Sequence, residues 1–186
     1  VLLNGKPPRT GIEKNKIFEG FLNIIQLTLK YKNETFQRLV MERKNAVAGI
    51  IFDKEKKSFI LTKQWRPGSE SNIVEIIAGV KDDKEEEITC IKRESLEEVG
   101  YQLQHIEHIN SCFLSPGGST EKVSIYYCEG VKVSQNSGLK EEGEFIEIIE
   151  IPLKEIDKID FFDAKTIIAI NFVKDKFLKQ NPLLNN

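Results

Sequence analysis

The chain has 186 residues, of which 40% are hydrophobic and 30% are charged, and its formal net charge at pH 7 is -2. This length suits one domain of ordinary size, or one domain with a small accessory piece, and the composition excludes a disordered chain. The 27 basic and 29 acidic residues form no Lys/Arg block, so we expect no nucleic acid partner.

The cysteines and the apolar runs indicate the cellular compartment in which the protein is expected. Cys90, Cys112 and Cys128 are widely spaced and form no CxxC pair, which favours small buried thiols in a reducing environment. The apolar start at residues 1–3 is too short for a signal peptide, and no apolar run approaches membrane-spanning length. We therefore expect a cytoplasmic protein with no membrane partner.

The N-terminal part of the chain is predicted to be rich in β-structure. Residues 1–15 contain prolines and are expected to be irregular, whereas residues 17–40 carry β-branched and aromatic residues with an expected turn at 32–34. We interpret residues 1–42 as a small N-terminal β subdomain. The alternative is a set of strands that merely extends the main sheet.

Residues 43–186 are predicted to form the main domain. Strands are expected at 45–52, 58–65, 72–78, 106–113, 122–129 and 145–151, a polar loop at 131–142, and helices at 153–159 and 163–178. The run at 45–52 is apolar throughout, as in a strand that is buried on both faces. With one more helix between the strands, this order favours an α/β (α+β) fold in which a mixed sheet lies between helices.

That additional helix is predicted in the second half of residues 79–101. Apolar or small side chains recur there at three- and four-residue spacing and form one stripe, which consists of Ile88, Ile91, Ser95, Leu96 and Val99. A glycine just after such a stripe is the usual signal for a helix to stop. We therefore expect the stripe to be buried and the helix to end at Gly100.

A cluster of carboxylates occupies another sector of the same helix. Glu94, Glu97 and Glu98 are neighbours there, since positions three and four apart adjoin on a helix surface. Three carboxylates this close repel one another, and a hard divalent cation such as Mg2+ or Mn2+ would offset the repulsion. The alternative is a solvated acidic face that Lys92 and Arg93 partly compensate.

The whole segment resembles the Nudix box of the Nudix hydrolases. The fixed positions of that motif are Gly79, Glu85, Arg93, Glu94, Glu97, Glu98 and Gly100 in this sequence. The one departure is Ser95, where the family usually has an aliphatic residue, and we expect the serine to weaken a buried contact. The resemblance implies the Nudix fold and the hydrolysis of a diphosphate bond with Mg2+ or Mn2+ as cofactor.

The resemblance also implies roles within the box. The residues that would hold the metal are Glu94, Glu97, Glu98 and, through its backbone carbonyl, Ala78. Of these, Glu97 and Glu98 are also the expected catalytic carboxylates. Gly79 would allow a sharp turn of the chain. Glu85 and Arg93 are interpreted as a structural ion pair that braces the loop of the box.

Further stretches resemble the branch of the family that cleaves nucleoside diphosphate sugars. They are residues 41–48, 64–67, 75–79, 115–121 and 163–166. In that branch the N-terminal strands form the interface of a homodimer, so the resemblance implies a homodimer here. The leading expected reaction is hydrolysis of ADP-ribose to AMP and ribose 5-phosphate. GDP-mannose and UDP-glucose are the alternative substrates.

The same resemblance suggests residues that contact the substrate. Arg66 follows a strand and could hold a phosphate oxygen with its fork of donors. Arg38 would reach the nucleotide pocket of the partner subunit, and Glu75 and Glu121 would lie near the substrate. The alternative interpretation is that these residues are ordinary charged residues at the surface, at a helix cap or in a strand.

The general base is expected in the acidic segment at residues 139–145. Glu144 corresponds best to the glutamate that positions the attacking water in this branch, and Glu142 is the reserve. The alternative for either residue is a place in an acidic loop exposed to solvent.

Two other functions are compatible with parts of the sequence. One is a catalytically silent Nudix module that senses a nucleotide, but such modules usually lose carboxylates that are all present in this box. The other is hydrolysis of a different diphosphate, such as a nucleoside triphosphate or a dinucleotide. The N-terminal strands and residues 115–121 argue against it.

Overall fold

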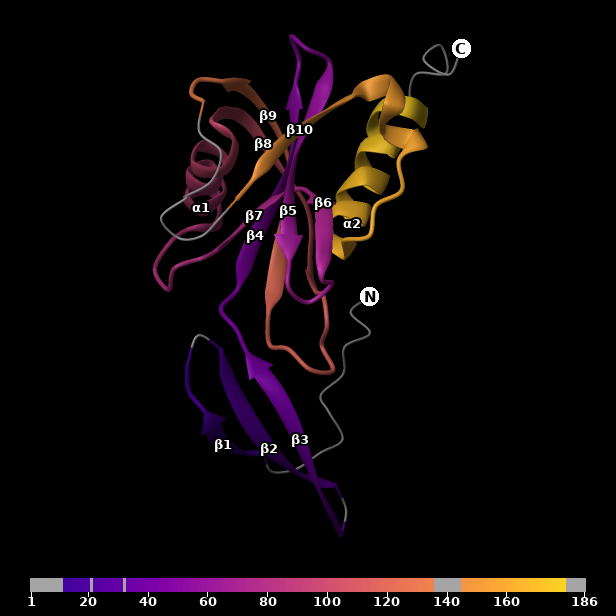
Figure 1. The fold of residues 1–186 in the computed structure, drawn as a ribbon. Helices are drawn as coiled ribbons and strands as arrows, with labels where there is room; N and C mark the ends of the chain where they lie inside the picture. Colours follow the sequence, from indigo (N-terminus) through magenta and orange to yellow (C-terminus); the bar gives the residue numbers. More distant parts are fainter. Residues whose placement is uncertain (1–11, 21, 32, 136–144, 180–186) are drawn as a thin grey trace. The chain divides into compact units, whose positions relative to one another are not determined.

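The computed structural model describes residues 12–20, 22–31, 33–135 and 145–179 (Figure 1). Contacts between residues divide the chain into two compact units. The smaller contains residues 1–44 and 115–121, and the larger contains residues 45–114 and 122–186. Within the described ranges, no helix is both long and apolar enough to cross a membrane.

The smaller unit contains an antiparallel sheet in the order β1-β2-β3. Its strands are β1 (Ile12–Phe18), β2 (Asn23–Tyr31) and β3 (Glu34–Glu42). The expectation of strands is confirmed, but β1 begins inside the stretch that we predicted to be irregular. Ile12 pairs with Leu29 of β2. The prolines that suggested irregular structure all precede this strand, so they do not interrupt its pairing.

The segment 115–121 is attached to β3 by hydrogen bonds. The backbone N–H of Met41 donates to the carbonyl of Gly118 over 2.8 Å, and that of Thr120 donates to the carbonyl of Met41 over 3.0 Å. Arg43 and Glu121 form an ion pair with a separation of 3.0 Å. A segment that is remote in sequence thus belongs to the smaller unit.

The larger unit is built on a mixed sheet, as predicted. Its strands are β4 (Ala46–Asp53), β5 (Ser58–Arg66), β6 (Ser71–Glu75), β7 (Ile77–Val80), β8 (Tyr101–Phe113), β9 (Lys122–Lys132) and β10 (Glu147–Pro152). The order is β10-β5-β4-β9-β8, and β6 pairs with β5 while β7 pairs with β4. Only the β4–β9 pairing is parallel among these strands.

The prediction of one strand over residues 72–78 is corrected to two short strands. β6 pairs with β5, whereas β7 pairs with the first half of β4. The change of partner occurs at Ile76, whose backbone N–H donates to Oγ1 of Thr166 over 2.9 Å instead of joining a strand. The break therefore brings the start of the C-terminal helix against the strands that precede the box.

Helices cover both faces of this sheet (Figure 1). α1 (Glu87–Glu94) continues into a π-helical turn at Ser95–Val99, and α2 (Ala164–Val173) into another at Lys174–Lys179, while Leu153–Lys158 forms a 3-10 helix. The two faces carry separate apolar clusters. The cluster under α1 includes Val47, Ile51, Ile60, Ile91 and Val99, and the cluster under α2 includes Ile50, Phe59, Leu61, Ile170 and Val173.

The buried stripe of α1 is narrower than predicted. Ile91, Ser95 and Val99 are buried, but the side chains of Ile88 and Leu96 are 42% and 39% exposed because they flank the contact with the sheet. Ser95 does not merely weaken a contact, since its Oγ donates to the carbonyl of Tyr101 over 2.8 Å. A buried hydroxyl with such a partner is stabilised rather than left unsatisfied.

Gly100 ends the helical segment, as predicted. Its φ is 70° and its ψ is 30°, which is the left-handed conformation that glycine adopts at low cost. A Cβ at this position would also lie 2.4 Å from the carbonyl oxygen of Ser134. The end of the helical segment and the end of β9 are therefore packed too closely for any side chain.

Candidate active site

Gly79 makes room for one of the box carboxylates. A Cβ at this position would lie 1.8 Å from Cδ of Glu94, so the Glu94 side chain packs directly on the glycine. Gly79 pairs with Val47 within the sheet, and Gly100 is the glycine with a positive φ in the described part of the chain. The sharp turn predicted at Gly79 is therefore wrong, and close packing explains the glycine instead.

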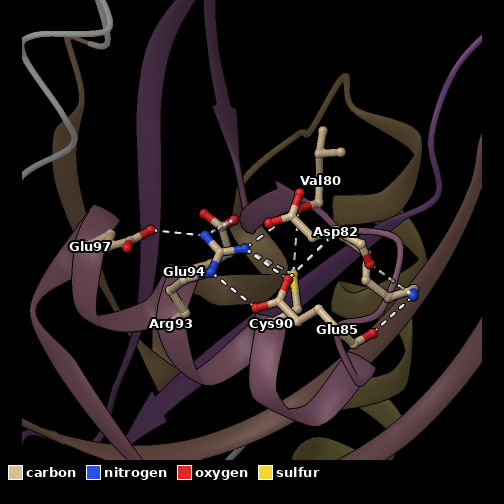
Figure 2. Close-up of polar contacts among 8 residues, drawn as sticks. Val80, Asp82, Glu85, Cys90, Arg93, Glu94 and Glu97 are labelled. Atoms are coloured by element: carbon tan, nitrogen blue, oxygen red, sulfur yellow. Dashed lines mark hydrogen bonds and ion pairs between the residues drawn. The ribbon is translucent and has the colours of Figure 1, made fainter.

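Arg93 is the centre of the ionic network in the box (Figure 2). Its Nε and Nη2 donate to the two oxygens of Glu85 over 3.0 and 3.1 Å. Its Nη1 donates to Glu94 over 2.7 Å and to Glu97 over 3.0 Å. The predicted Glu85–Arg93 ion pair is present, and the same guanidinium also offsets part of the repulsion between the acidic side chains.

These contacts keep the groups of the network charged. The hydrogen bond from Arg93 lowers the pKa of Glu85 to about 2, although burial opposes the shift. The pKa of Arg93 is raised above its ordinary value, mainly by the hydrogen bond to Glu85. The charge of Glu94 and the hydrogen bonds to Glu97 and Glu94 add to this shift, and burial opposes it. Glu85 and Arg93 therefore both stay ionised across the whole neutral range of pH.

The thiol of Cys90 lies beside this network. Arg93 Nη2 is 3.4 Å from the sulfur, and burial raises the pKa of Cys90 to about 12. A thiol with so high a pKa is a poor nucleophile. Cys90 and Cys128 are buried free thiols, as expected, whereas Cys112 is a free thiol that is only partly buried. The cytoplasmic location stays a prediction.

The three clustered carboxylates differ in their access to solvent. The side chain of Glu97 is 34% exposed and that of Glu94 is 12% exposed, whereas Glu98 is only 5% exposed. Glu97 and Glu98 belong to the π-helical turn, a feature that often marks functional sites. Access to solvent thus decreases from Glu97 through Glu94 to Glu98, and these three carboxylates are called the acidic ridge below.

The donor set of this ridge suits a hard divalent cation. The carboxylates and the carbonyl of Ala78, which adjoins Gly79, offer only oxygen ligands, as Mg2+ and Mn2+ prefer. Among the residues that the structure describes, no group of three His, Cys, Asp or Glu side chains is arranged to hold a metal ion as it stands. Arg93 is the group with which a cation would compete for Glu94 and Glu97.

A second ionic cluster lies at the junction of β5 and β6. Glu75 is 2% exposed, and its Oε1 accepts a hydrogen bond of 2.6 Å from Nε of Arg66. Its Oε2 accepts one of 2.5 Å from Nζ of Lys165, which also lies 3.0 Å from Asp163. Two positively charged side chains thus contact the Glu75 carboxylate, Arg66 from the sheet and Lys165 from the first turn of α2.

This second cluster is electrostatically linked to the box. Burial disfavours the charge on Arg66, but the hydrogen bond to Glu75 and the negative charges of Glu75, Glu98 and Asp163 outweigh it and raise the pKa of Arg66. The side chain of Arg66 is still 42% exposed. The negative charge of Glu98, the most buried carboxylate of the box, thus helps to stabilise a guanidinium that is still accessible to solvent.

The remaining predicted residues lie elsewhere or outside the described ranges. Arg38 is an exposed residue of β3, and its Nη1 donates to the carbonyl of Gln37 over 2.8 Å. Glu121 is the ion-pair partner of Arg43 in the smaller unit. Glu142 and Glu144 lie outside the described residues, so their expected role as general base stays a prediction.

Lys165 was missed because its sequence context gives no sign of burial. It lies at the start of a helix between residues of mixed character, where a lysine is usually solvated. The signal that could have indicated a role for Lys165 is the resemblance of residues 163–166 to the nucleoside diphosphate sugar branch of the family. The ionic partner that makes burial possible, Glu75, is distant in the sequence.

Comparisons with known proteins support the resemblance of the box. The NUDIX domain family matches residues 42–170. A GDP-mannose pyrophosphatase of Cronobacter sakazakii is 34% identical over 149 residues, which cover 74% of this chain and 78% of that protein. A methanol dehydrogenase activator of Bacillus methanolicus is 31% identical over 169 residues, or 88% of this chain and 91% of that protein.

A solved structure confirms the fold. The crystal structure of an ADP compounds hydrolase aligns with a TM-score of 0.75 and 19% sequence identity, and the alignment covers 95% of this chain and 98% of that one. The family match extends over more than half of the chain and includes every position of the box. The chain belongs to the Nudix family and is a Nudix hydrolase.

Proposed function

We propose that this protein hydrolyses the diphosphate bond of a nucleoside diphosphate sugar to a nucleoside monophosphate and a sugar phosphate. The observation that carries the proposal is the ionic geometry of the site, in which Arg93 holds the box carboxylates Glu94 and Glu97 and the partly exposed guanidinium of Arg66 is held by the buried Glu75. A guanidinium can hold phosphate oxygens through a fork of hydrogen bonds, while carboxylates can hold the cation that such a substrate brings.

Two nucleotide sugars are the first candidates. GDP-mannose is supported by the name of the Cronobacter sakazakii relative, and several further relatives at 31 to 32% identity have the same name. ADP-ribose is the substrate that we expected from the sequence. The two differ in base and sugar, whereas the diphosphate that Arg66 would contact is common to both.

We assign the metal to the acidic ridge. Glu94, Glu97, Glu98 and the Ala78 carbonyl would hold Mg2+ or Mn2+, which supplies charge neutralisation at phosphate oxygens and lowers the pKa of bound water. Nη1 of Arg93 lies within ion-pair distance of both Glu94 and Glu97 and so holds these two carboxylates close together. The attacking water is proposed to be positioned by Glu144, with Glu142 as the reserve.

A substrate panel tests this function. We expect the purified protein with Mg2+ or Mn2+ to convert GDP-mannose, ADP-ribose or both to the nucleoside monophosphate, as measured by ion-exchange chromatography of the products. ATP, a dinucleotide and UDP-glucose complete the panel. Cleavage of ATP or the dinucleotide alone would overturn the substrate class, and the absence of any turnover would favour a silent module.

We also propose that the protein is a homodimer whose interface includes the small sheet. All seven residues of β1 are exposed, and Phe18 and Leu39 are 58% and 59% exposed. Large apolar side chains that lie open on so small a sheet are typical of a protein interface. We expect light scattering to give twice the mass of one chain and Leu39→Glu to give more monomer. A wild-type monomer at micromolar concentration would contradict the dimer.

A further inference from the structure

The side chain of Lys165 belongs to the second ionic cluster, where it contacts other side chains of the protein. It is 8% exposed and donates to the buried Glu75, while Asp163 accepts a second contact. A buried lysine is retained only when its charge is paired, and here two carboxylates pair it. Nζ is therefore committed to other side chains of the protein and is not a contact for a ligand.

The helix that carries Lys165 is itself fixed to the sheet. Oδ2 of Asp163 caps the first turn of α2 by accepting hydrogen bonds from the N–H of Thr166 over 3.0 Å and from its Oγ1 over 2.6 Å. Oγ1 of Thr166 in turn accepts from the N–H of Ile76, the residue after Glu75. The separation between Lys165 and Glu75 is thus set by backbone contacts on both sides.

The geometry of Arg66 differs from that of the other guanidinium in the site. Arg93 forms a two-point fork with both oxygens of Glu85. Arg66 meets Glu75 through Nε and one oxygen, and this is its one hydrogen bond from the guanidinium to another side chain within the described residues. The second oxygen of Glu75 is occupied by Lys165.

We propose that Lys165 is a positioning residue for Arg66. A guanidinium beside a carboxylate with two available oxygens favours the two-point fork. Lys165 donates to Oε2 of Glu75 and so competes with Arg66 for that oxygen. Arg66 therefore meets Glu75 through Nε alone, and its terminal nitrogens are left available for the diphosphate of the substrate. This inference rests on the proposed role of Arg66 in binding the substrate.

The first test removes the charge of Lys165 and keeps most of its volume. For the nucleotide sugar that the panel identifies, we expect Lys165→Met to lower kcat/KM by roughly 10- to 100-fold, as is usual when the support of a functional side chain is lost. The loss should appear mainly in KM, since the contact of Arg66 with the diphosphate already forms on binding. Lys154→Met changes an exposed lysine in the same way and should leave both constants unchanged.

A double-variant cycle shows whether the effect passes through Arg66. In the Arg66→Met background, Lys165→Met should change kcat/KM by no more than about twofold, because there is no guanidinium left to position. A further loss as large as that in the wild type would show an independent role and overturn the proposal. An unchanged kcat/KM for Lys165→Met alone would do the same.

Another pair of variants serves if the single variant does not fold. Glu75→Gln with Lys165→Met removes both charges of the buried Glu75–Lys165 pair, so neither of these two buried residues is left as an unpaired ion. The kcat/KM of the double variant should equal that of Glu75→Gln within about twofold. A neutral amide at position 75 cannot form the two-point ion pair with Arg66 that Lys165 is proposed to prevent. A tenfold difference between them would overturn the proposal.

The same experiments separate this inference from the proposed function. If Arg66→Met alone has wild-type kcat/KM, the assignment of Arg66 to the diphosphate fails, whatever Lys165 does. If Arg66→Met lowers kcat/KM and Lys165→Met does not, the function stands and the positioning role is wrong.

Discussion

Glu98→Gln is expected to lower kcat by roughly a thousandfold, the upper range for loss of one preorganised electrostatic group in an active site. Glu98 is the most buried carboxylate of the box, and its negative charge helps to raise the pKa of Arg66. Glutamine keeps the shape of the side chain but removes the negative charge. The variant should therefore lose the cation-binding group without leaving a cavity in the core.

Three measurements check this expectation. Steady-state kinetics gives kcat, titration with Mn2+ followed by electron paramagnetic resonance gives the affinity for the cation, and thermal unfolding reports on the fold. We expect both functional values to fall while the unfolding midpoint stays close to that of the wild type. Wild-type turnover in Glu98→Gln would remove the acidic ridge from the mechanism.

Glu86→Gln is the matched control. It makes the same chemical change at an exposed glutamate just before α1, which has no side-chain hydrogen bond that caps the helix. Because this side chain is solvated, its replacement should leave kcat and the affinity for Mn2+ unchanged. A large effect of this control would show that overall charge, rather than the position of Glu98, governs activity.

Gly79→Ala is expected to lower kcat by about a hundredfold with little loss of stability, since small misplacements of catalytic groups have effects of that size. The new Cβ would lie 1.8 Å from Cδ of Glu94, so the carboxylate must move. The strand itself has no positive φ at this residue, and the clash involves the flexible end of a side chain. The backbone can therefore remain in place while Glu94 is displaced.

Steady-state kinetics and thermal unfolding of Gly79→Ala test this separation of activity from stability. Gly68→Ala is the control, because no heavy atom lies within 4 Å of a Cβ built there. In the Glu94→Ala background, Gly79→Ala should cost no further activity, since the side chain that it displaces is gone. A strongly lowered unfolding midpoint would instead assign a structural role to Gly79.

The sequence was sufficient to predict features that depend on local spacing. The alternation of strands and helices and the end of the helical segment at Gly100 are both predicted correctly. In each case the residue types and their separation along the chain determine the structure. The Nudix box is a motif of this kind, and the family match includes it.

Features that depend on packing between distant segments could not be predicted. The glycine at position 79 was assigned to a turn because only the contact with Glu94 reveals the close approach. The break at Ile76 coincides with a hydrogen bond from its backbone N–H to Oγ1 of Thr166, and the burial of Lys165 depends on Glu75. No local pattern contains either partner, so the structure was needed to find them.

The pairing of β4 limits the order in which the larger unit can be completed during synthesis. β4 forms its parallel ladder with β9 from Ala46–Val123 to Phe52–Glu129, whereas its antiparallel contacts with β5 and β7 are nearer in sequence. A chain emerging from a ribosome can form the near contacts first, but one edge of its central strand has no partner until β9 has left the exit tunnel. The segment that carries the box is thus translated well before the sheet beneath it can close.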